Sequence, residues 1–193
     1  MPPNAAPPGT SGPAPTVRAP VVLGVGNILY GDEGVGVYAA RALEHCYRFT
    51  PEVEIVDGAT LGFAMIDLFH GPGTLIVLDA LATDAHPGSI FRLPAEELLR
   101  LGPEMQPTAH EVDPVTLLRL APLFGEPPEM VLIGIVPFNA SDLAIGLTPP
   151  LVAAFDEFVN VTLSELSAKG VRADQRAPLS LDDVVASLVA GTR

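Results

Sequence analysis

The chain has 193 residues, is 48% hydrophobic and contains a single cysteine, so it can bury one core of ordinary size without disulfide bonds. Its formal net charge of −13 comes from 23 acidic against 10 basic residues, which argues against nucleic acid or an anionic membrane surface as a partner. No apolar run approaches the roughly 20 residues that span a bilayer.

The first 20 residues are rich in Pro, Ala and Gly and contain almost no large apolar side chain. Such a stretch cannot bury enough surface to offset the entropy lost on ordering, so we expect residues 1–20 to be disordered. The stretch also lacks the positive start and apolar centre of a secretory signal, which predicts a cytoplasmic protein. We also expect the protein to be a monomer. Residues 21–170 form the predicted α/β domain. Residues 171–193 form a C-terminal extension that either docks as a short helix or stays loose.

The segment 21–43 organises the rest of the chain. An apolar run meets Gly24 and Gly26 and is followed, after a polar turn, by apolar residues at helical spacing. This pattern predicts a buried strand, a loop and an amphipathic helix. Asp32 and Glu33 fall where the helix should begin, and unpaired N–H groups there favour negative charge. The same position places a carboxylate at the carboxyl end of a parallel strand, where open α/β sheets build their sites.

The glycines of this segment also suggest a nucleotide-binding loop, but the details disfavour it. The dinucleotide fingerprint requires a small residue three positions after Gly26, where this chain has Leu29. A P-loop requires a lysine, whereas this loop contains two acids. Two carboxylates repel phosphate and attract a cation.

Further strands and helices alternate along the chain. The patterns predict strands at 53–56, 74–78, 89–93 and 130–136, and helices at 61–69, 94–101, 114–121 and 148–169. Alternation of this kind predicts an α/β fold of three layers, with a mainly parallel, twisted sheet of about five strands and helices on both faces.

Familiar signatures of nucleophilic and zinc hydrolases are missing from the sequence. No serine lies in a G-x-S-x-G elbow, and no H-E-x-x-H is present. Cys46 lies on the apolar side of the first predicted helix, where a buried and inert thiol is expected. The remaining histidines at 45, 70 and 86 are expected to be solvated.

A dispersed set of three residues remains for chemistry: Glu33, Asp79 and His110. Glu33 follows the first predicted strand, Asp79 ends the third, and His110 precedes a helix. Parallel strands would bring the two acids together at their carboxyl ends, with the histidine reaching in from its loop. Two carboxylates and an imidazole suit nickel, zinc or cadmium-like divalent ions and leave coordination positions open.

Four ordered motifs resemble the hydrogenase maturation endopeptidases, which trim the C-terminal extension from the large subunit of nickel–iron hydrogenases once nickel is in place. The opening motif is GVGNILYGDEGVGV at 24–37, and the others are VDGATLG at 56–62, IVLDA at 76–80 and VLIGIVP at 131–137. The resemblance extends from about residue 21 to about residue 170. Four motifs in order are far more specific than any single glycine pattern.

The resemblance implies that Glu33, Asp79 and His110 contact nickel and form the catalytic site. It also implies a hydrogenase large-subunit precursor as partner, with nickel carried by that precursor; another divalent metal in the free enzyme remains open. Cleavage would be of an aspartic or metal-assisted type, through a metal-polarised carbonyl, a metal-bound water or general-base help from an acid. The alternative is a nickel-binding maturation chaperone or checkpoint protein that does not cleave.

Neighbouring residues receive supporting roles in this interpretation. Asp57, Gly58 and residues 60–62 are expected to shape the cleft beside the metal, or only to form turns. Asn27 is expected to hold its loop through side-chain hydrogen bonds. Asp32 is expected to cap the helix that follows it.

Overall fold

The computed structural model describes residues 19–59, 61–71, 73–100, 106–107 and 114–191. Its strands are β1 (Val21–Gly24), β2 (Tyr47–Thr50), β3 (Glu54–Asp57), β4 (Thr74–Ala82), β5 (Ile90–Pro94), β6 (Gln106–Pro107), β7 (Glu129–Ile135) and β8 (Arg172–Gln175). The α-helices are α1 (Val35–Cys46), α2 (Ala95–Arg100), α3 (Pro114–Leu120), α4 (Pro149–Ala168) and α5 (Leu181–Gly191). Three 3-10 segments complete the list: η1 (Gly31–Gly34), η2 (Gly62–Leu68) and η3 (Ala121–Leu123). The prediction of disorder for residues 1–20 falls almost wholly outside the described residues.

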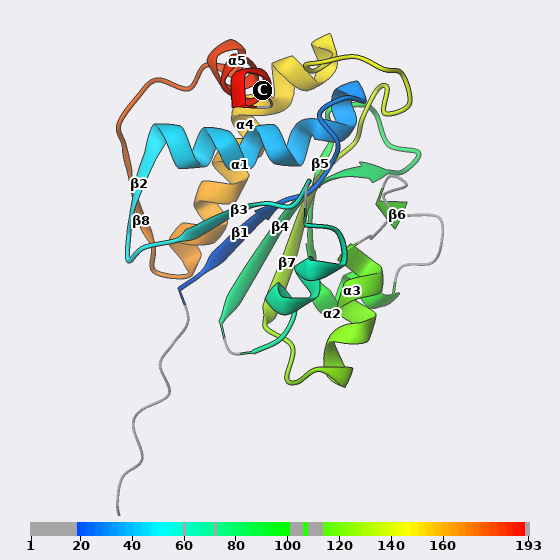
Figure 1. The fold of residues 1–193 in the computed structure, drawn as a ribbon, viewed down its shortest axis with the longest axis vertical. Helices are drawn as coiled ribbons and strands as arrows, with labels where there is room; N and C mark the ends of the chain where they lie inside the picture. The colour runs from blue at the N-terminus through cyan, green and yellow to red at the C-terminus, as the bar shows by residue number, and fades with distance from the viewer. Residues whose placement is uncertain (1–18, 60, 72, 101–105, 108–113, 192–193) are drawn as a thin grey trace, which may run out of the picture.

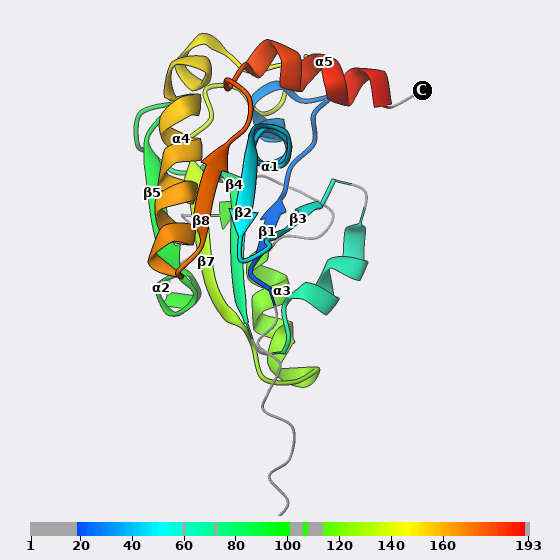
Figure 2. The ribbon, with the colours of Figure 1, turned by 90° about the vertical axis from the view of Figure 1, so that its left-hand side faces the viewer.

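The central sheet confirms the predicted fold class. Its strands follow the order β3-β1-β4-β7-β5, and β6 pairs with β4 beside this path. Strands β3, β1, β4 and β7 run parallel, whereas β5 and β6 are antiparallel to their neighbours. Figures 1 and 2 show α4 along one face of the sheet and α3 on the other.

Alternating residues of the buried strands divide the core into two parts. Ile76, Leu78 and Ala80 of β4 pack with α1 and α4, while Leu75 and Val77 face η2, α2 and α3. Both sets are apolar, which explains why this strand forms a continuous hydrophobic run in the sequence.

Strand β4 is longer than predicted, and this moves Asp79 into the strand. Asp79 and Ala80 still pair with Gly134 and Ile135 of β7, and the last two residues of β4 pair with β6. The polar Asp79 suggested a strand end in the sequence. Pairing on the β7 side overrides that local signal.

The predicted helix at 61–69 is the 3-10 segment η2. Met65 and Phe69 of the apolar stripe are buried, but Ala64 of the same stripe is exposed and Ile66, which lies off it, is buried. Over two turns, a repeat of three or four residues fits a 3-10 helix as well as an α-helix, so the spacing could not separate them.

The residues after 170 pack onto the same core. Val171 and Val184 are buried in the cluster formed by α1 and α4, and α5 contacts α1. Strand β8 pairs with β2 in a separate two-stranded sheet, neither strand of which was predicted. Within the described residues, no helix is long and apolar enough to cross a bilayer.

Candidate active site

Glycines allow the end of β1, the loop after it and the start of α1 to pack on one another. A Cβ at Gly36 would overlap the carbonyl oxygens of Leu78 and Val25, and one at Gly26 would overlap the carbonyl oxygen of Glu33. Gly26 has φ +135°, a conformation that favours glycine. These glycines are therefore needed because backbone segments of the chain pack closely against one another here. This removes the main support for the nucleotide-binding alternative.

Asp32 does not cap α1 as predicted. The N-cap of that helix is Gly34, which makes no side-chain cap bond. The buried Asp32 carboxylate instead accepts hydrogen bonds from the backbone N–H groups of Phe138, Asn139 and Thr148, at 2.9, 3.0 and 2.7 Å. It also accepts one from the Thr148 hydroxyl at 2.7 Å. Asp32 thus joins the β1–α1 loop to residues 138–148.

The bond to Asp32 also decides what the Thr148 side chain does. Thr148 occupies the N-cap position of α4, but its side chain does not cap that helix. Its hydroxyl is used by Asp32 instead. A hydrogen bond to a carboxylate distant in the sequence therefore takes the place of the local N-cap bond that a threonine at this position commonly makes.

Glu33 and Asp79 lie at the same end of the sheet, on elements in contact. Glu33 in η1 is 6% exposed and Asp79 in β4 is fully buried. The 3-10 segment η1 contacts β4, and α1, which follows η1 directly, packs against the Leu78 carbonyl beside Asp79. Asp79 Oδ1 accepts a hydrogen bond of 2.8 Å from its neighbour, the Ala80 N–H. The two predicted acids thus lie on elements that contact each other.

The third predicted residue, His110, lies outside the described residues. Helix α3 begins at Pro114, four positions later, and packs on the sheet face that includes Val77. By strand alternation, Asp79 belongs to that same face. Among the described residues, no group of three or more His, Cys, Asp or Glu side chains could hold a metal ion. The described part of the chain contains two members of the predicted set.

Further residues fix the loops around the two acids. Asn27 Oδ1 accepts a hydrogen bond of 3.0 Å from Leu29 N–H, which confirms its predicted role. The exposed Asp57 accepts one from Ala59 N–H at 2.9 Å in a local turn. Gly58 N–H donates to the Gly24 carbonyl at 2.8 Å, so this turn lies against the end of β1.

Tyr38 is a link that sequence reasoning missed. Its hydroxyl donates to the Ile28 carbonyl at 3.3 Å and accepts from Gly146 N–H at 3.0 Å. Burial raises the pKa of Tyr38, so the hydroxyl stays protonated and can make both bonds. Helical spacing marked position 38 only as part of α1; no local signal identifies a partner 108 residues away.

Cys46 is buried, as predicted. Its thiol donates to the Pro178 carbonyl at 3.6 Å, and burial raises the pKa of Cys46. A thiol with a raised pKa is a poor nucleophile at neutral pH. Cys46 is therefore a packing residue.

The fold and the site define an α/β protein with an acidic centre above the carboxyl ends of a mainly parallel sheet. A family model described as "HycI: Hydrogenase maturation protease" matches residues 37–165, more than half of the chain. The chain is 30% identical over 163 residues to a hydrogenase expression/formation protein, HupD, of Thiocapsa roseopersicina, covering 84% of this chain and 74% of the relative. It is 34% identical over 158 residues to the hydrogenase 2 maturation protease of Escherichia coli K12, covering 81% and 95%.

A solved structure gives the same result. The hydrogenase maturating endopeptidase HybD from E. coli matches with a TM-score of 0.69 and 30% identity, over 82% of this chain and 98% of that one. The chain belongs to the hydrogenase maturation protease family. It is therefore a peptide hydrolase with a role in hydrogenase processing.

Proposed function

We propose that this protein is an endopeptidase that removes the C-terminal extension of a nickel–iron hydrogenase large-subunit precursor after nickel insertion. In this proposal Glu33, Asp79 and His110 contact the nickel that the precursor carries. The enzyme would cut only when the correct peptide and the correct ion are both present. The metal is then part of the substrate and acts as a signal of completed insertion.

The observation that carries the proposal is the pair of buried acids, Glu33 and Asp79, on contacting elements of a maturation-protease fold. Carboxylates with so little access to water favour a nearby cation, because burial in a medium of low dielectric strengthens their attraction to it. An imidazole from His110 would add a nitrogen ligand of the kind that nickel accepts. This donor set leaves positions open for ligands from the precursor.

Two routes of peptide-bond hydrolysis fit these side chains. In one, the precursor's nickel polarises the scissile carbonyl or a bound water. In the other, Glu33 or Asp79 takes a proton from the attacking water and the proton passes to the leaving amine. In both, water adds to the carbonyl carbon, and the C–N bond breaks to leave a new carboxylate and a free amine.

The decisive experiment is mass spectrometry of a purified large-subunit precursor, with and without nickel, after incubation with the protein. We expect loss of one C-terminal peptide from the nickel-loaded precursor alone. Cleavage of both forms would overturn nickel gating but keep the protease activity. An unchanged mass for both forms of the cognate precursor would favour the alternative of a chaperone that does not cleave.

The role of His110 needs its own variant. His110→Ala should stay folded and lose processing of the nickel-loaded precursor, whereas His86→Ala, an exposed histidine in a turn, should process normally. Mass spectrometry over a time course gives both rates. Normal processing by His110→Ala would show that another residue supplies the third ligand.

A further inference from the structure

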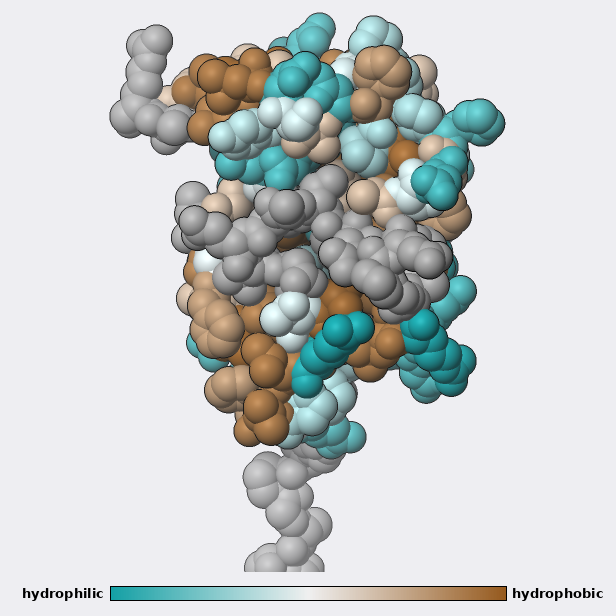
Figure 3. Space-filling model, turned by 90° about the vertical axis from the view of Figure 1, so that its right-hand side faces the viewer, coloured by the Kyte–Doolittle hydropathy of each residue, from teal (hydrophilic) through white to brown (hydrophobic). Residues whose placement is uncertain are grey.

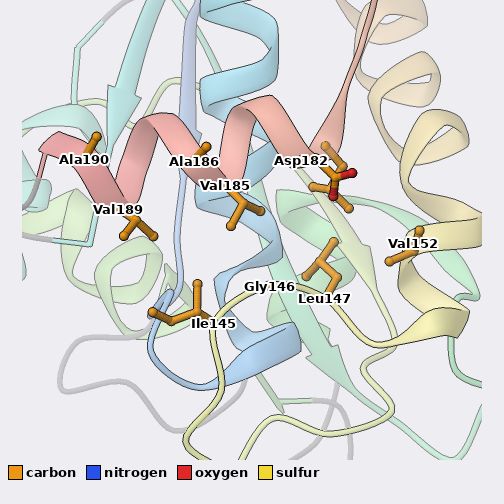
Figure 4. A pocket seen from close by; sticks show the side chains of 10 residues that line it. Ile145, Gly146, Leu147, Val152, Asp182, Val185, Ala186, Val189 and Ala190 are labelled. Carbon is orange, nitrogen blue, oxygen red and sulfur yellow. The ribbon is translucent and has the colours of Figure 1, made fainter.

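An apolar groove lies between α5 and the start of α4. It has a volume of about 820 Å³, and its apolar lining includes Ile145, Leu147, Val152, Val185 and Val189. Figure 4 shows Val185 and Val189 pointing from α5 toward the side where Ile145 and Leu147 lie. We call this feature the α5 groove.

The walls of the α5 groove are exposed although they are apolar. Ile145 is 56% exposed, Val152 50% and Val189 40%. Figure 3 shows apolar surface at the top of the molecule, beside the C-terminal end of α5. Exposed apolar side chains that lie together in this way often mark a binding site, because most of a protein surface exposes apolar residues only singly.

Helix α5, which forms one wall of the groove, is attached to the core by packing and by a hydrogen bond. Val184 is buried in the core of α1 and α4, and the Arg41 side chain of α1 donates to the Ser187 hydroxyl at 3.4 Å. The helix lies beyond residue 165, where the match to the family model ends. The groove is therefore built in part by a segment outside the region matched to that model.

The floor of the α5 groove is connected to the candidate site. Gly146 is hydrogen-bonded to Tyr38, and Ala144 exchanges backbone bonds with Leu29 and Gly31 at 2.9 and 2.7 Å. Two residues after Gly146, Thr148 is held by Asp32, the neighbour of Glu33. A chain bound in the groove thus lies along the loop that leads to the acids.

Charge restricts what the groove can bind. Among the described residues that line it, the one charged side chain is Asp182, and Asp183 follows in the same turn of α5. Two copies meeting through this face would bring two acidic rims together on chains of net charge −13. The chain's own first 18 residues contain no Leu, Ile or aromatic residue to fill an apolar groove.

We propose that the α5 groove binds an apolar segment of the protein substrate that has a basic residue beside it. The apolar side chains lie between α5 and residues 145–147, and the basic residue faces Asp182. This inference rests on the proposed function, because it takes the precursor as the occupant. It adds a second point of contact, away from the nickel, that selects the peptide.

The test compares matched variants on processing of the nickel-loaded precursor. The double variant Ile145→Gln/Val189→Gln should lower kcat/KM about 10-fold, the effect of losing well-packed apolar contacts, with kcat at saturation unchanged. Leu123→Gln, an exposed apolar residue of η3, is the control and should match the parent protein. Equal kcat/KM in the double variant and the parent would overturn the groove while leaving the proposed function intact.

The charge of Asp182 has a separate readout. Asp182→Lys should lower kcat/KM at low ionic strength and recover at high ionic strength, because salt screens exposed charges. Asp182→Asn should show a smaller change of the same kind. A salt dependence identical to that of the parent would remove the basic residue from the proposal.

A cross-linking arm decides the matter if the parent protein processes no precursor. Val189→Cys labelled with a photoreactive thiol reagent should cross-link to the precursor, and Leu123→Cys should not; Cys46 is buried in both. Cross-linking to a second copy of this chain, or to nothing, would overturn the inference. The proposed cleavage and the proposed groove can therefore fail separately.

Discussion

Two regions of this protein bury carboxylates, and they compensate the negative charge in different ways. Between β5 and α4, Glu165 is almost fully buried, and Arg92 donates two hydrogen bonds to its carboxylate, at 2.6 and 3.0 Å. At the carboxyl ends of β1 and β4, Asp32 is held by backbone N–H groups and a hydroxyl. Neutral donors hold a carboxylate without cancelling its charge.

The two regions differ in whether the carboxylate that is held, Glu165 or Asp32, is paired with a positive charge inside the chain. The hydrogen bonds from Arg92 lower the pKa of Glu165, and this ion pair joins β5 to α4. Asp32, Glu33 and Asp79 instead lie on contacting elements near the carboxyl ends of β1 and β4, and the groups that donate to Asp32 are neutral. The Arg92–Glu165 pair therefore has a structural role, and in the proposed function Glu33 and Asp79 contact the nickel of the substrate.

The largest expected effect comes from removing charge at the acidic edge. Glu33→Gln and Asp79→Asn should each lower the rate of precursor processing about 1,000-fold, equivalent to about 4 kcal/mol, because each removes a charge proposed to contact nickel. Both should fold, since the amides keep the shape of the acids. Rates from mass spectrometry and melting temperatures from calorimetry provide the measurements.

The matched control for this prediction is Glu165→Gln. It should have a lower melting temperature and still process the precursor at the normal rate, because Glu165 belongs to the ion pair between β5 and α4 and not to the proposed site. If Glu33→Gln retained its rate, or Glu165→Gln lost it, the comparison between the two regions would fail.

The next effect concerns the close packing that positions the acids. Gly36→Ala should lower the free energy of unfolding by about 3 kcal/mol, because its methyl group would overlap backbone carbonyl oxygens that cannot turn away. Gly170→Asn is a suitable control: its surroundings are open, and asparagine tolerates the positive φ of +80° there. Chemical denaturation measures both; equal stability would show that α1 can shift away from β4 at little cost.

A smaller effect is expected at Asp32. Asp32→Ala should cost about 2 kcal/mol, because three backbone N–H groups lose an acceptor and water can replace only part of it. It should also raise KM, since the loop that carries the floor of the α5 groove is released. Asp32→Asn should recover part of both, because its carbonyl oxygen can still accept from Thr148. Denaturation curves and steady-state kinetics test this, and a variant as stable as the parent would contradict it.

The smallest effect concerns the Arg92–Glu165 pair and depends on pH. The pKa of Glu165 is lowered on folding, so its contribution to stability is present above the unfolded value of about 4.3 and is lost as pH falls through the folded value. Arg92→Met should therefore cost about 1 kcal/mol at pH 7, a modest figure because Arg92 is 46% exposed. The difference from the parent should shrink below about pH 4. A difference independent of pH between 3 and 7 would contradict this assignment.

Local patterns were sufficient for most of the framework. The apolar runs of β1, β4 and β7 and the stripes of α1 and α4 predicted their elements, because burial on one or both faces leaves a periodic trace. The chain order of strand, loop and helix also predicted that Glu33 and Asp79 would share an edge of the sheet. Parallel strands joined by right-handed crossovers leave few other arrangements.

Elements that are short, or that depend on a partner far away in the sequence, were not predicted. Strand β2 pairs with β8, which lies more than 120 residues later, and neither has a pattern of its own. The 3-10 character of η2 is invisible over two turns of apolar spacing. The position of His110 relative to the acids stays a prediction, as do the cytoplasmic location and the monomeric state.

The sequence by itself determined the α/β class and the family resemblance, because these depend on periodicity and on residues close together in the chain; the roles of Glu33 and Asp79 stay a prediction. Only the tertiary structure decided which carboxylate would bond to Thr148, which would pair with Arg92, and that α5 would form one wall of a groove. Those contacts join residues 73 to 146 positions apart. Local propensity has no information about such distant partners; they are chosen by how the layers pack.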